Sequence, residues 1–554
     1  MRTSDLFRNR EKAWQNSNRI AVVSYWLREC HLDHGIRSIP PPKDLPLLPT
    51  RVIDVGPADG SEDPYLCLSA GRYGLYTCLS HCWGKNKPLS MTLENLESLV
   101  QRIDLSTLPK TFLDAVEITR GLGIRYLWID SLCIAQGDKG DWDYESTRMG
   151  TIYEKSYLTI AATAAANSEQ GCFQEGTVVK LQLACNNTSP DGDHEHNTVG
   201  FIGLEASELR NFFKAPLNRR AWTLQEITLA PRVVHFAEDQ MYWKCPHGAA
   251  SEDGSLDRFT ISSDRFTDTN DFASRFLWWN IAEDYSRRQL SHEDDRLRAL
   301  AHITKAFQQR TGYRPVVGLW QEDIHYGLLW SNVHSSPTRP GMPSWSWLSV
   351  NGLIQRPPER IRHAEADLKI VGINVSWSDK EINSLLAQAS ISVRGRVMPT
   401  TWDLEQGKPQ ILPPSVPKTN SGRRFGNHIP FDDETRFRHY SSKQSPKMIS
   451  GIGSCSFDRG PDTAGKTIHC LLVSKSAAPR SVHDEARFVW SRQDISSGEE
   501  YNVLLLDHNY RRIGTGNIHY GSFTKWVQEV AEISGDSVKR IEDRIWSWLQ
   551  VTLI

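Results

Sequence analysis

The chain has 554 residues, which is too long for one ordinary domain, so we expect two or three domains. Its 64 Lys and Arg residues nearly balance its 66 Asp and Glu residues, and the formal net charge of −2 disfavours a protein dedicated to binding nucleic acid. Hydrophobic residues make up 39% of the chain and aromatic residues 10%, so the composition supports folded cores and excludes wholesale disorder.

The sequence shows neither a membrane span nor an export signal. The longest nearly uncharged apolar stretch, residues 157–166, has about half of the roughly 20 residues that a membrane helix needs. Residues 1–14 carry charges where a secretory signal would be apolar. We therefore expect a cytoplasmic protein.

The ten cysteines are sparse and irregularly spaced, and no CxxC pair occurs. Several lie in apolar, strand-like runs, where a cysteine is usually a small buried side chain. This pattern favours neither a metal site nor a disulfide framework. The 19 tryptophans favour large aromatic cores over a surface that stacks bases or sugars.

Changes in the hydrophobic period divide the chain into four segments. We expect a helical lead-in with a Pro-rich linker (1–49), an α/β domain (50–260), a helical extension (261–342), and a β-rich C-terminal region (343–554) that contains a long loop at about 413–450 and a terminal helix.

The α/β domain begins with two predicted strands, at 51–55 and 76–83, which are rich in β-branched and aromatic residues. Residues 108–123 have the spacing of a helix with one apolar face. Residues 124–134 are nearly all apolar, as in a strand covered on both faces, and 157–165 form another buried strand. Strands that alternate with helices over short connections predict a parallel α/β sheet.

The pattern becomes mixed after residue 175. A polar loop is expected at 186–197, a hairpin at 231–245, and a helical stretch from about 271 to 310. Apolar and polar residues alternate in 343–400 and 465–518, which predicts an antiparallel β region. The last 30 residues have a helical pattern.

Candidate functional residues follow the predicted strands of the parallel sheet. Ligands of open parallel sheets bind beyond the carboxyl ends of the strands. The residues at these ends are His81, Cys82, Trp83 and Gly84 after the first sheet strand, and Asp130, Ser131, Cys133 and Gln136 after the second.

A second helix of the domain is predicted after Asp141, and Trp142 lies at its start. On this helix Glu145 shares a face with Met149 and Ile152, which places the carboxylate in the first turn, at the rim of the sheet and facing inward. Glu145 is therefore a candidate catalytic residue. In the alternative interpretation, it caps free amides or pairs with an arginine.

Three further groups leave two interpretations open. Asp130 is either catalytic or an anchor for loop amides, because a carboxylate after a buried strand needs a hydrogen-bond partner. Cys82 is a candidate catalytic thiol, and both it and Cys133 are either nucleophiles or packing residues. Residues 219–226 are either an ion-paired helix start or one wall of a polar pocket, to which Arg220, Trp222, Gln225 and Glu226 would contribute.

No Walker loop, GxGxxG, HExxH or GxSxG motif occurs, which removes the common nucleotide-binding, zincin and hydrolase interpretations.

Three blocks of the sequence resemble those of the fungal heterokaryon-incompatibility (HET) domain family. They are YTCLSHCWG (76–84), LPKTFLDAVEITRGLGIRYLWIDSLCIAQ (108–136) continuing to GCF (171–173), and RRAWTLQEITLAPRVVHF (219–236). Downstream, residues 285–300, GLW (318–320) and PSWSW (343–347) resemble the extended form of these proteins.

The resemblance implies a parallel-sheet α/β domain distantly similar to the Toll/interleukin-receptor (TIR) fold, or flavodoxin-like. It also implies non-self recognition between fused fungal cells and programmed cell death. Some TIR-like domains cleave NAD with a glutamate on the helix after a central strand, and Glu145 matches that location. Trp83 or Trp142 would then stack on the base. The pattern departs in one respect, because Trp142 lies three residues before Glu145 and not four.

We consider three functions. The first is an incompatibility or cell-death factor that acts through self-association or a protein partner, with or without NAD cleavage. The second is an enzyme of fungal specialised (secondary) metabolism that performs acid/base chemistry on a small metabolite in the same pocket. The third is a non-catalytic interaction scaffold. The sequence indicates no particular cofactor, and we expect no metal, with NAD as a candidate substrate and no nucleic acid as partner.

Overall fold

The structure is a computed structural model, and the described residues form two compact units. They are drawn from Met1–Leu277 with Arg288–Thr311 and from Trp278–Arg287 with Gly312–Ile554. The described residues are 16–33, 45–85, 88–173, 181–184, 198–201, 212, 214–246, 248–254, 271–333, 339, 341–358, 364–378, 386–405, 408–412, 453–458, 468–477, 499–534 and 537–554.

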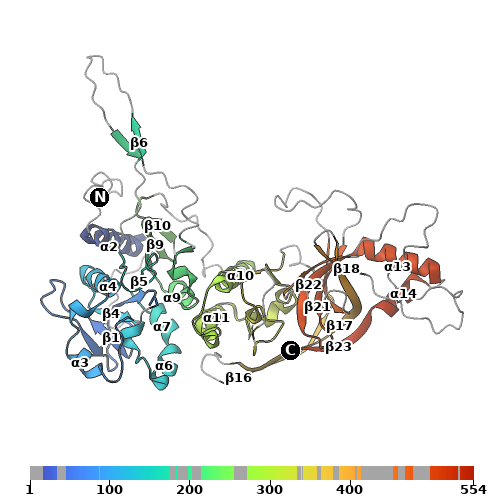
Figure 1. The fold of residues 1–554 in the computed structure, drawn as a ribbon, viewed down its shortest axis with the longest axis horizontal. Helices are drawn as coiled ribbons and strands as arrows, with labels where there is room; N and C mark the ends of the chain where they lie inside the picture. The colour runs from blue at the N-terminus through green and yellow to red at the C-terminus, as the bar shows by residue number, and fades with distance from the viewer. Residues whose placement is uncertain are drawn as a thin grey trace, which may run out of the picture. The chain divides into compact units, whose positions relative to one another are not determined.

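A mixed sheet organises the first unit (Figure 1). Its order is β10-β9-β8-β5-β3-β4-β1-β2, in which β8, β5, β3 and β4 are parallel and the strands at either side pair antiparallel. A separate antiparallel pair joins β6 and β7. The strands are β1 (Arg51–Asp54), β2 (Tyr65–Leu68), β3 (Tyr76–Ser80), β4 (Tyr126–Ile129), β5 (Leu158–Ala161), β6 (Leu181–Ala184), β7 (Thr198–Phe201), β8 (Val233–Phe236), β9 (Met241–Cys245) and β10 (Gly248–Ser251).

Helices cover both faces of this sheet. The helices of the first unit are α2 (Asn16–Asp33), α3 (Leu96–Gln101), α4 (Lys110–Gly121), α5 (Asp130–Cys133), α6 (Lys139–Ser146), α7 (Met149–Glu154), α9 (Trp222–Leu229) and α11 (Arg298–Thr311), with 3-10 turns at Leu105–Thr107, Leu217–Arg219 and Glu293–Asp295. On β3, Thr77 contacts Thr119 of α4, whereas the Tyr76 hydroxyl donates to the carbonyl of Ile152 in α7. α2 and α4 therefore lie on one side and α7 and α9 on the other (Figure 1).

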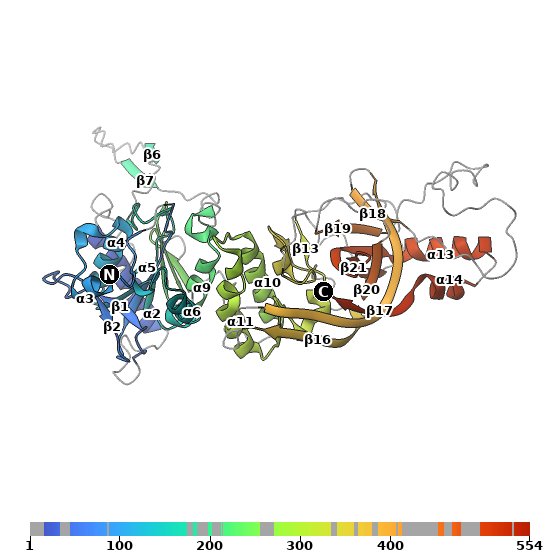
Figure 2. The same ribbon diagram turned by 60° about the horizontal axis from the view of Figure 1, so that its bottom comes forward.

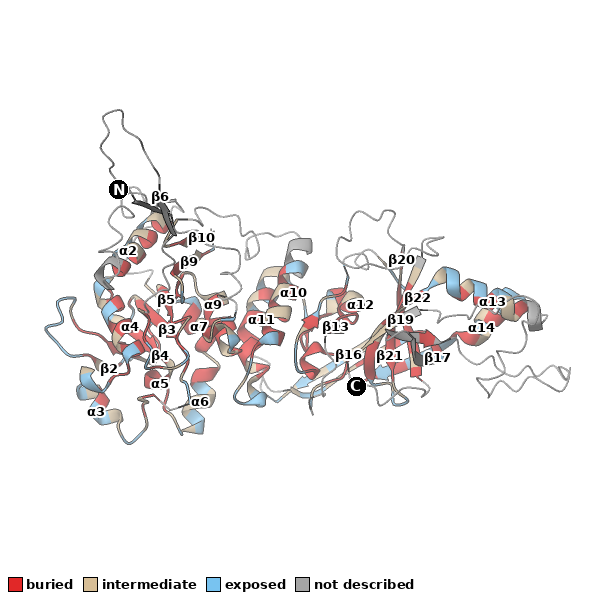
Figure 3. Ribbon diagram, turned by 45° about the horizontal axis from the view of Figure 1, so that its top comes forward, coloured by how far each residue is buried: buried red, intermediate tan, exposed pale blue. Residues whose placement is uncertain are grey.

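The buried strands explain why the central sequence pattern is so apolar. Every residue of β3 and β5 is buried, as are the last three of β4 (Figure 3). The predicted strands at 76–83 and 157–165, the helix at 108–123 and the hairpin at 231–245 are confirmed, and so is the α/β class of the domain. The strand predicted at 124–134 is present only as β4, because residues 130–133 form the short helix α5.

Two features of this sheet differ from expectation. The strand predicted at 51–55 is present, but β1 runs antiparallel both to β4 and to its other neighbour β2, so it lies outside the parallel part of the sheet. Sequence analysis did not identify β2. The loop predicted at 186–197 and the prolines at 40–42 lie outside the described residues.

The second unit contains part of α10 and a large antiparallel sheet. Its helices are α10 (Asp271–Arg287, from Trp278 on), α12 (Ile324–Gly327), α13 (Tyr520–Ser534) and α14 (Val538–Ile545), with 3-10 turns at Gln321–Asp323 and Trp347–Ser349. Its strands are β11 (Pro315–Val316), β12 (Leu319–Trp320), β13 (Ser331–Asn332), β14 (Ile354–Gln355), β15 (Glu365–Ala366), β16 (Lys369–Trp377), β17 (Leu386–Glu405), β18 (Lys408–Leu412), β19 (Gly453–Phe457), β20 (Ile468–Ala477), β21 (Glu499–Leu506), β22 (Arg512–His519) and β23 (Ser547–Leu553).

One long strand holds this sheet together. β17 pairs with β16, β18, β20 and β23, and its pairing with β16 makes the extended ribbon visible in Figure 2. The predicted antiparallel region and terminal helix are confirmed in these strands and in α13 and α14. Residues 547–553 are an exception, because they pair with β17 as β23 and are not helical. The loop expected at about 413–450 lies outside the described residues.

Tryptophans fill much of the core of the second unit. Five of them are less than 2% exposed, namely Trp278, Trp320, Trp330, Trp345 and Trp347. The composition therefore predicted their packing role correctly. None of the described helices in either unit is both long and apolar enough to cross a membrane.

Candidate functional site

The order of the parallel strands selects one edge of the first sheet. Along the chain the parallel strands are β3, β4, β5 and β8, but in space the order is β4-β3-β5-β8. From β3 the chain passes to β4 on one side, and it then crosses to β5 on the other side of β3. The direction in which successive strands are added to the sheet therefore reverses between β3 and β5. Ligands of doubly wound sheets bind at the carboxyl ends of the strands that flank such a reversal.

A polar group, which we call the switch-point cluster, lies at this reversal and consists of Ser80, Tyr153, Arg220 and Glu226. The Ser80 hydroxyl donates to Glu226 Oε2 at 2.5 Å. Arg220 donates to the carbonyl of His81, and the Tyr153 hydroxyl contacts Glu226 and donates to the strand carbonyl of Leu79 at 3.0 Å. Burial raises the pKa of Glu226 to about 7, against the opposing effects of Arg220 and Ser80. Glu226 can therefore exchange a proton near neutral pH.

A second group surrounds Asp130 at the ends of β3 and β4. Asp130 accepts hydrogen bonds from Trp83 Nε1 at 3.0 Å and from the amide of Ser131 at 2.7 Å. The Asp130 carboxylate thus binds an amide in the first turn of α5 and also orients a half-buried indole. His81 Nδ1 lies 3.8 Å from Asp130 Oδ1, and burial lowers the pKa of His81 to about 4. The imidazole is therefore neutral at neutral pH.

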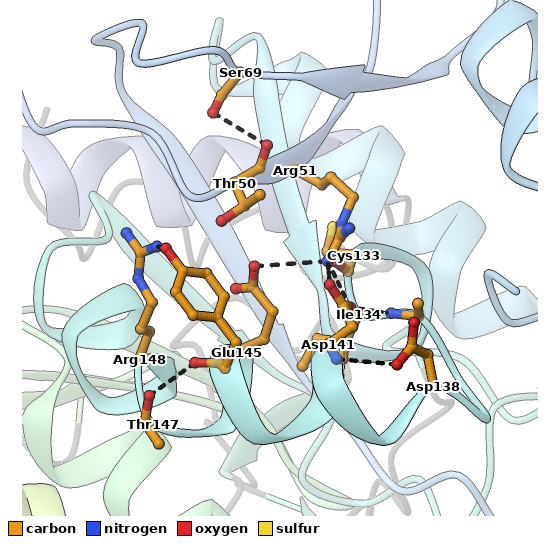
Figure 4. Close-up of polar contacts among 12 residues, drawn as sticks. Thr50, Arg51, Ser69, Cys133, Ile134, Asp138, Asp141, Glu145, Thr147 and Arg148 are labelled. Atoms are coloured by element: carbon orange, nitrogen blue, oxygen red, sulfur yellow. Dashed lines mark hydrogen bonds and ion pairs between the residues drawn. The ribbon is translucent and has the colours of Figure 1, made fainter. Parts of the chain in front are cut away.

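The third group, the Glu145 cluster, comprises Thr50, Arg51, Asp141 and Glu145 (Figure 4). Arg51 donates through Nε to the Cys133 carbonyl at 2.7 Å and through Nη2 to both oxygens of Asp141 at 2.6 Å. The same Nη2 lies 3.6 Å from Glu145 Oε1. Glu145 is only 1% exposed, and burial raises its pKa, whereas Thr50 and Arg51 favour the ionised form. Its Oε1 makes no hydrogen bond to any described residue.

The position of Glu145 on its helix corrects the sequence prediction. α6 begins at Lys139, because the Asp138 side chain caps it by accepting from two amides, and it ends at Ser146. Glu145 therefore lies in the last turn of α6 and not in a first turn. Met149 and Ile152 belong to the next helix, α7, although both remain buried.

The two cysteines are packed among apolar or buried groups. Cys82 belongs to a small apolar cluster with Ala161, Leu217, Ile227 and Val233, and burial raises the pKa of its thiol. Burial raises the pKa of Cys133 to about 12. Both side chains are therefore neutral thiols at neutral pH, and we assign neither a nucleophilic step below.

The remaining candidate residues line the same edge or support it. Trp142 and Trp222 meet edge to face with ring centroids 6.1 Å apart, and the Trp222 indole donates to Asp295 at 3.3 Å. Gly84 has a φ of +80°, and a Cβ there would lie 2.4 Å from the Asn167 side chain.

Two glutamines are held differently. Gln136 is half-buried and bonds its own loop through the Ile134 carbonyl. Gln225 is fully buried, and neither of its amide atoms bonds to a described residue.

Sequence reasoning missed Thr50, Arg51, Ser80 and Tyr153. Arg51 is the first residue of a predicted strand, but its register against β4 decides which carboxylates it reaches, and no local pattern encodes that register. Ser80 and His81 are adjacent at the end of β3 and point to opposite faces, and their side chains contact different partners, Glu226 and Asp130.

The comparisons with known proteins identify the domain. The family described as Heterokaryon incompatibility protein (HET) matches residues 76–226, which run from the start of β3 into α9. Residues 76–226 match the HET domain family. No curated protein and no solved structure matches the chain. The HET domain contains the switch-point cluster, Asp130 and Glu145, whereas Arg51 precedes it.

Proposed function

We propose that this chain is a heterokaryon-incompatibility-type factor whose HET domain cleaves the nicotinamide–ribose bond of NAD and thereby triggers cell death. The observation that carries the proposal is Glu145, a buried carboxyl at the carboxyl edge of the sheet, with Oε1 unbonded and an arginine beside it. The strand order β4-β3-β5-β8 supports a flavodoxin-like or TIR-like arrangement, because those doubly wound folds have the same reversal.

The reaction breaks one C–N bond and consumes water. Nicotinamide leaves with the bonding electron pair, positive charge develops on the ribose, and water adds to the anomeric carbon and releases a proton. A carboxylate at this point accepts hydrogen bonds from the ribose hydroxyls and stabilises the cationic transition state. Glu145 acts in this role as the ionised form, which Arg51 and Thr50 favour.

Other residues of the HET domain would hold the dinucleotide. The Trp83 indole, fixed by Asp130, offers a flat face for stacking, and Trp142 offers a second. Arg220 supplies a half-buried cation near the strand ends, which suits a pyrophosphate.

An interaction role is the second candidate, and the internal pairing of Arg51 favours it. Arg51 already binds Asp141 and the Cys133 carbonyl, so the Glu145 cluster has the contacts of an anchor that fixes α6 to β1. In that case the HET domain would act through a protein partner or self-association.

The test measures nicotinamide release from NAD by purified full-length protein, and NAD levels and viability in cells that express it. Glu145→Gln keeps the shape and removes the charge, and Glu154→Gln, at an exposed position of α7, is the matched control. We expect activity and toxicity in wild type and Glu154→Gln, and a loss of at least about 100-fold in Glu145→Gln with the thermal midpoint within a few degrees. Unchanged NAD levels in dying cells, together with no release in vitro, would leave the interaction role.

A further inference from the structure

Helix α2 and strand β9 present the same pair of residue types at matching spacings. Trp26 and Cys30 are four residues apart on α2, so they share one face and are separated by about 6 Å along the helix. Trp243 and Cys245 are two residues apart on β9, so they also share one face and are separated by about 6.6 Å. A contact between the tryptophans therefore brings the cysteines together as well.

Both contacts are present. The rings of Trp26 and Trp243 have centroids 6.1 Å apart. The thiol of Cys30 is in hydrogen-bonding contact with Cys245, and both are buried thiols of the same core. The helix is thus held to the strand at two successive points on one face.

An arginine completes the site. The register of β8 with β9 pairs Val233 with Lys244, and Arg232 and Cys245 are the residues next to this pair. Arg232 also contacts Cys30 electrostatically, and it donates to the carbonyl of Tyr157 at 3.0 Å. A guanidinium in contact with the Cys30 thiol favours the thiolate that oxidation requires.

We propose that Cys30 and Cys245 form a modification site that a hydroperoxide oxidises to a disulfide. One thiolate attacks the peroxide oxygen, the O–O bond breaks, and a sulfenic acid and water form. The second thiol then attacks the sulfenic sulfur, the S–S bond forms, and a second water leaves with the thiol proton. In total two thiols and one hydrogen peroxide give one disulfide and two waters.

The environment sets the conditions for this reaction. Hydrogen bonding to Cys245 and burial raise the pKa of Cys30, whereas Arg232 lowers it. The pair therefore stays reduced under a low peroxide load and reacts under a sustained one. The disulfide would link α2 to β9, in the sheet that also contains the strands of the HET domain, and it would close a loop of about 215 residues. This inference is independent of NAD cleavage.

The test is peptide mapping of full-length protein treated with hydrogen peroxide. After alkylation of the remaining thiols, tryptic digestion without reductant should yield one linked species of residues 29–37 and 245–258, each of which contains a single cysteine. The thermal midpoint should rise by roughly 5–15 °C, and a reductant should reverse both changes.

Three variants control the assignment. Cys30→Ala and Cys245→Ala should lose the linked species and the thermal shift, whereas Cys172→Ala, a buried cysteine of the same core, should keep both. The proposal is overturned if other cysteines oxidise while Cys30 and Cys245 remain alkylated, or if each forms only sulfinic or sulfonic acid. If a variant fails to fold, the peptide map of the peroxide-treated wild-type protein is sufficient to test the proposal, because it shows directly whether Cys30 and Cys245 are linked.

Discussion

Replacing Glu226 with glutamine should change the pH dependence of stability by a calculable amount. The side chain is fully enclosed and accepts the Ser80 hydrogen bond, and burial raises its pKa from 4.5 to about 7. A difference of about 2.5 pKa units between the folded and unfolded states corresponds to ~3 kcal/mol.

The sign follows from which state holds the proton. The folded pKa of Glu226 lies above the unfolded value, so between pH 4.5 and 7 the folded state keeps a proton that the unfolded state releases. This stabilisation is complete below pH 4.5 and is lost as the pH rises through 7. Glu226→Gln has no such proton. Relative to wild type, it should therefore gain ~3 kcal/mol between pH 4.5 and 8, or roughly 6–12 °C in midpoint.

Scanning calorimetry of wild type and Glu226→Gln from pH 4.5 to 8 measures this difference. His81, His235 and His302 are buried, and desolvation lowers their pKa values to about 4, 3 and 4, so they destabilise both proteins as the pH falls below 6.5. Their effect cancels in the comparison. Glu97→Gln, an exposed position on α3, is the control. A difference that stays flat within about 1 kcal/mol would show that Arg220 holds Glu226 ionised, and the proton-exchange role of the switch-point cluster would be withdrawn.

Two further predictions concern packing in the first unit. Trp128→Ala removes a side chain that is 1% exposed and meets Tyr153 edge to face. The free energy of unfolding, measured by chemical denaturation, should therefore fall by about 3–5 kcal/mol. Gly150→Ala should destabilise by roughly 1–3 kcal/mol in the same assay, although alanine normally improves a helix, because its Cβ would lie 2.3 Å from that of His302 and push α7 from α11.

Matched substitutions check both results. Trp548→Ala removes a tryptophan that is 54% exposed and should stay within about 1 kcal/mol of wild type. Gly140→Ala places a Cβ no closer than 3.3 Å to a side-chain oxygen and should also be nearly neutral. A neutral Trp128→Ala would contradict the position of β4 in the core, and a stabilising Gly150→Ala would contradict the close approach of α7 and α11.

The sequence predicted those parts of the fold whose signals are local. The apolar run that became β4 and the amphipathic spacing of α4 are such signals, and both elements lie where the pattern put them. β2 escaped notice because a four-residue strand with one exposed end has little periodicity. Residues 547–553 carry a helical pattern, but pairing with β17 outweighs that preference.

The candidate site shows the same division. The carboxyl-edge rule brought Trp83 and Asp130 together without any tertiary information, and they are hydrogen-bonded. The break between α6 and α7 has no glycine or proline to mark it, so Glu145 was placed in the wrong turn. That break coincides with long-range contacts such as the ion pair of Asp143 with Arg298, which no local window contains.

The strand β17 has a consequence for synthesis of the chain. Its residues 391–397 pair with β23, which follows about 150 residues later. At typical rates of elongation, the ribosome needs on the order of ten seconds to synthesise β23 after this part of β17. During that time the backbone donors and acceptors of this edge of β17 are open to pairing with other strands. We therefore expect the second unit to depend on chaperones more than the first, whose parallel strands are all made within the first 236 residues.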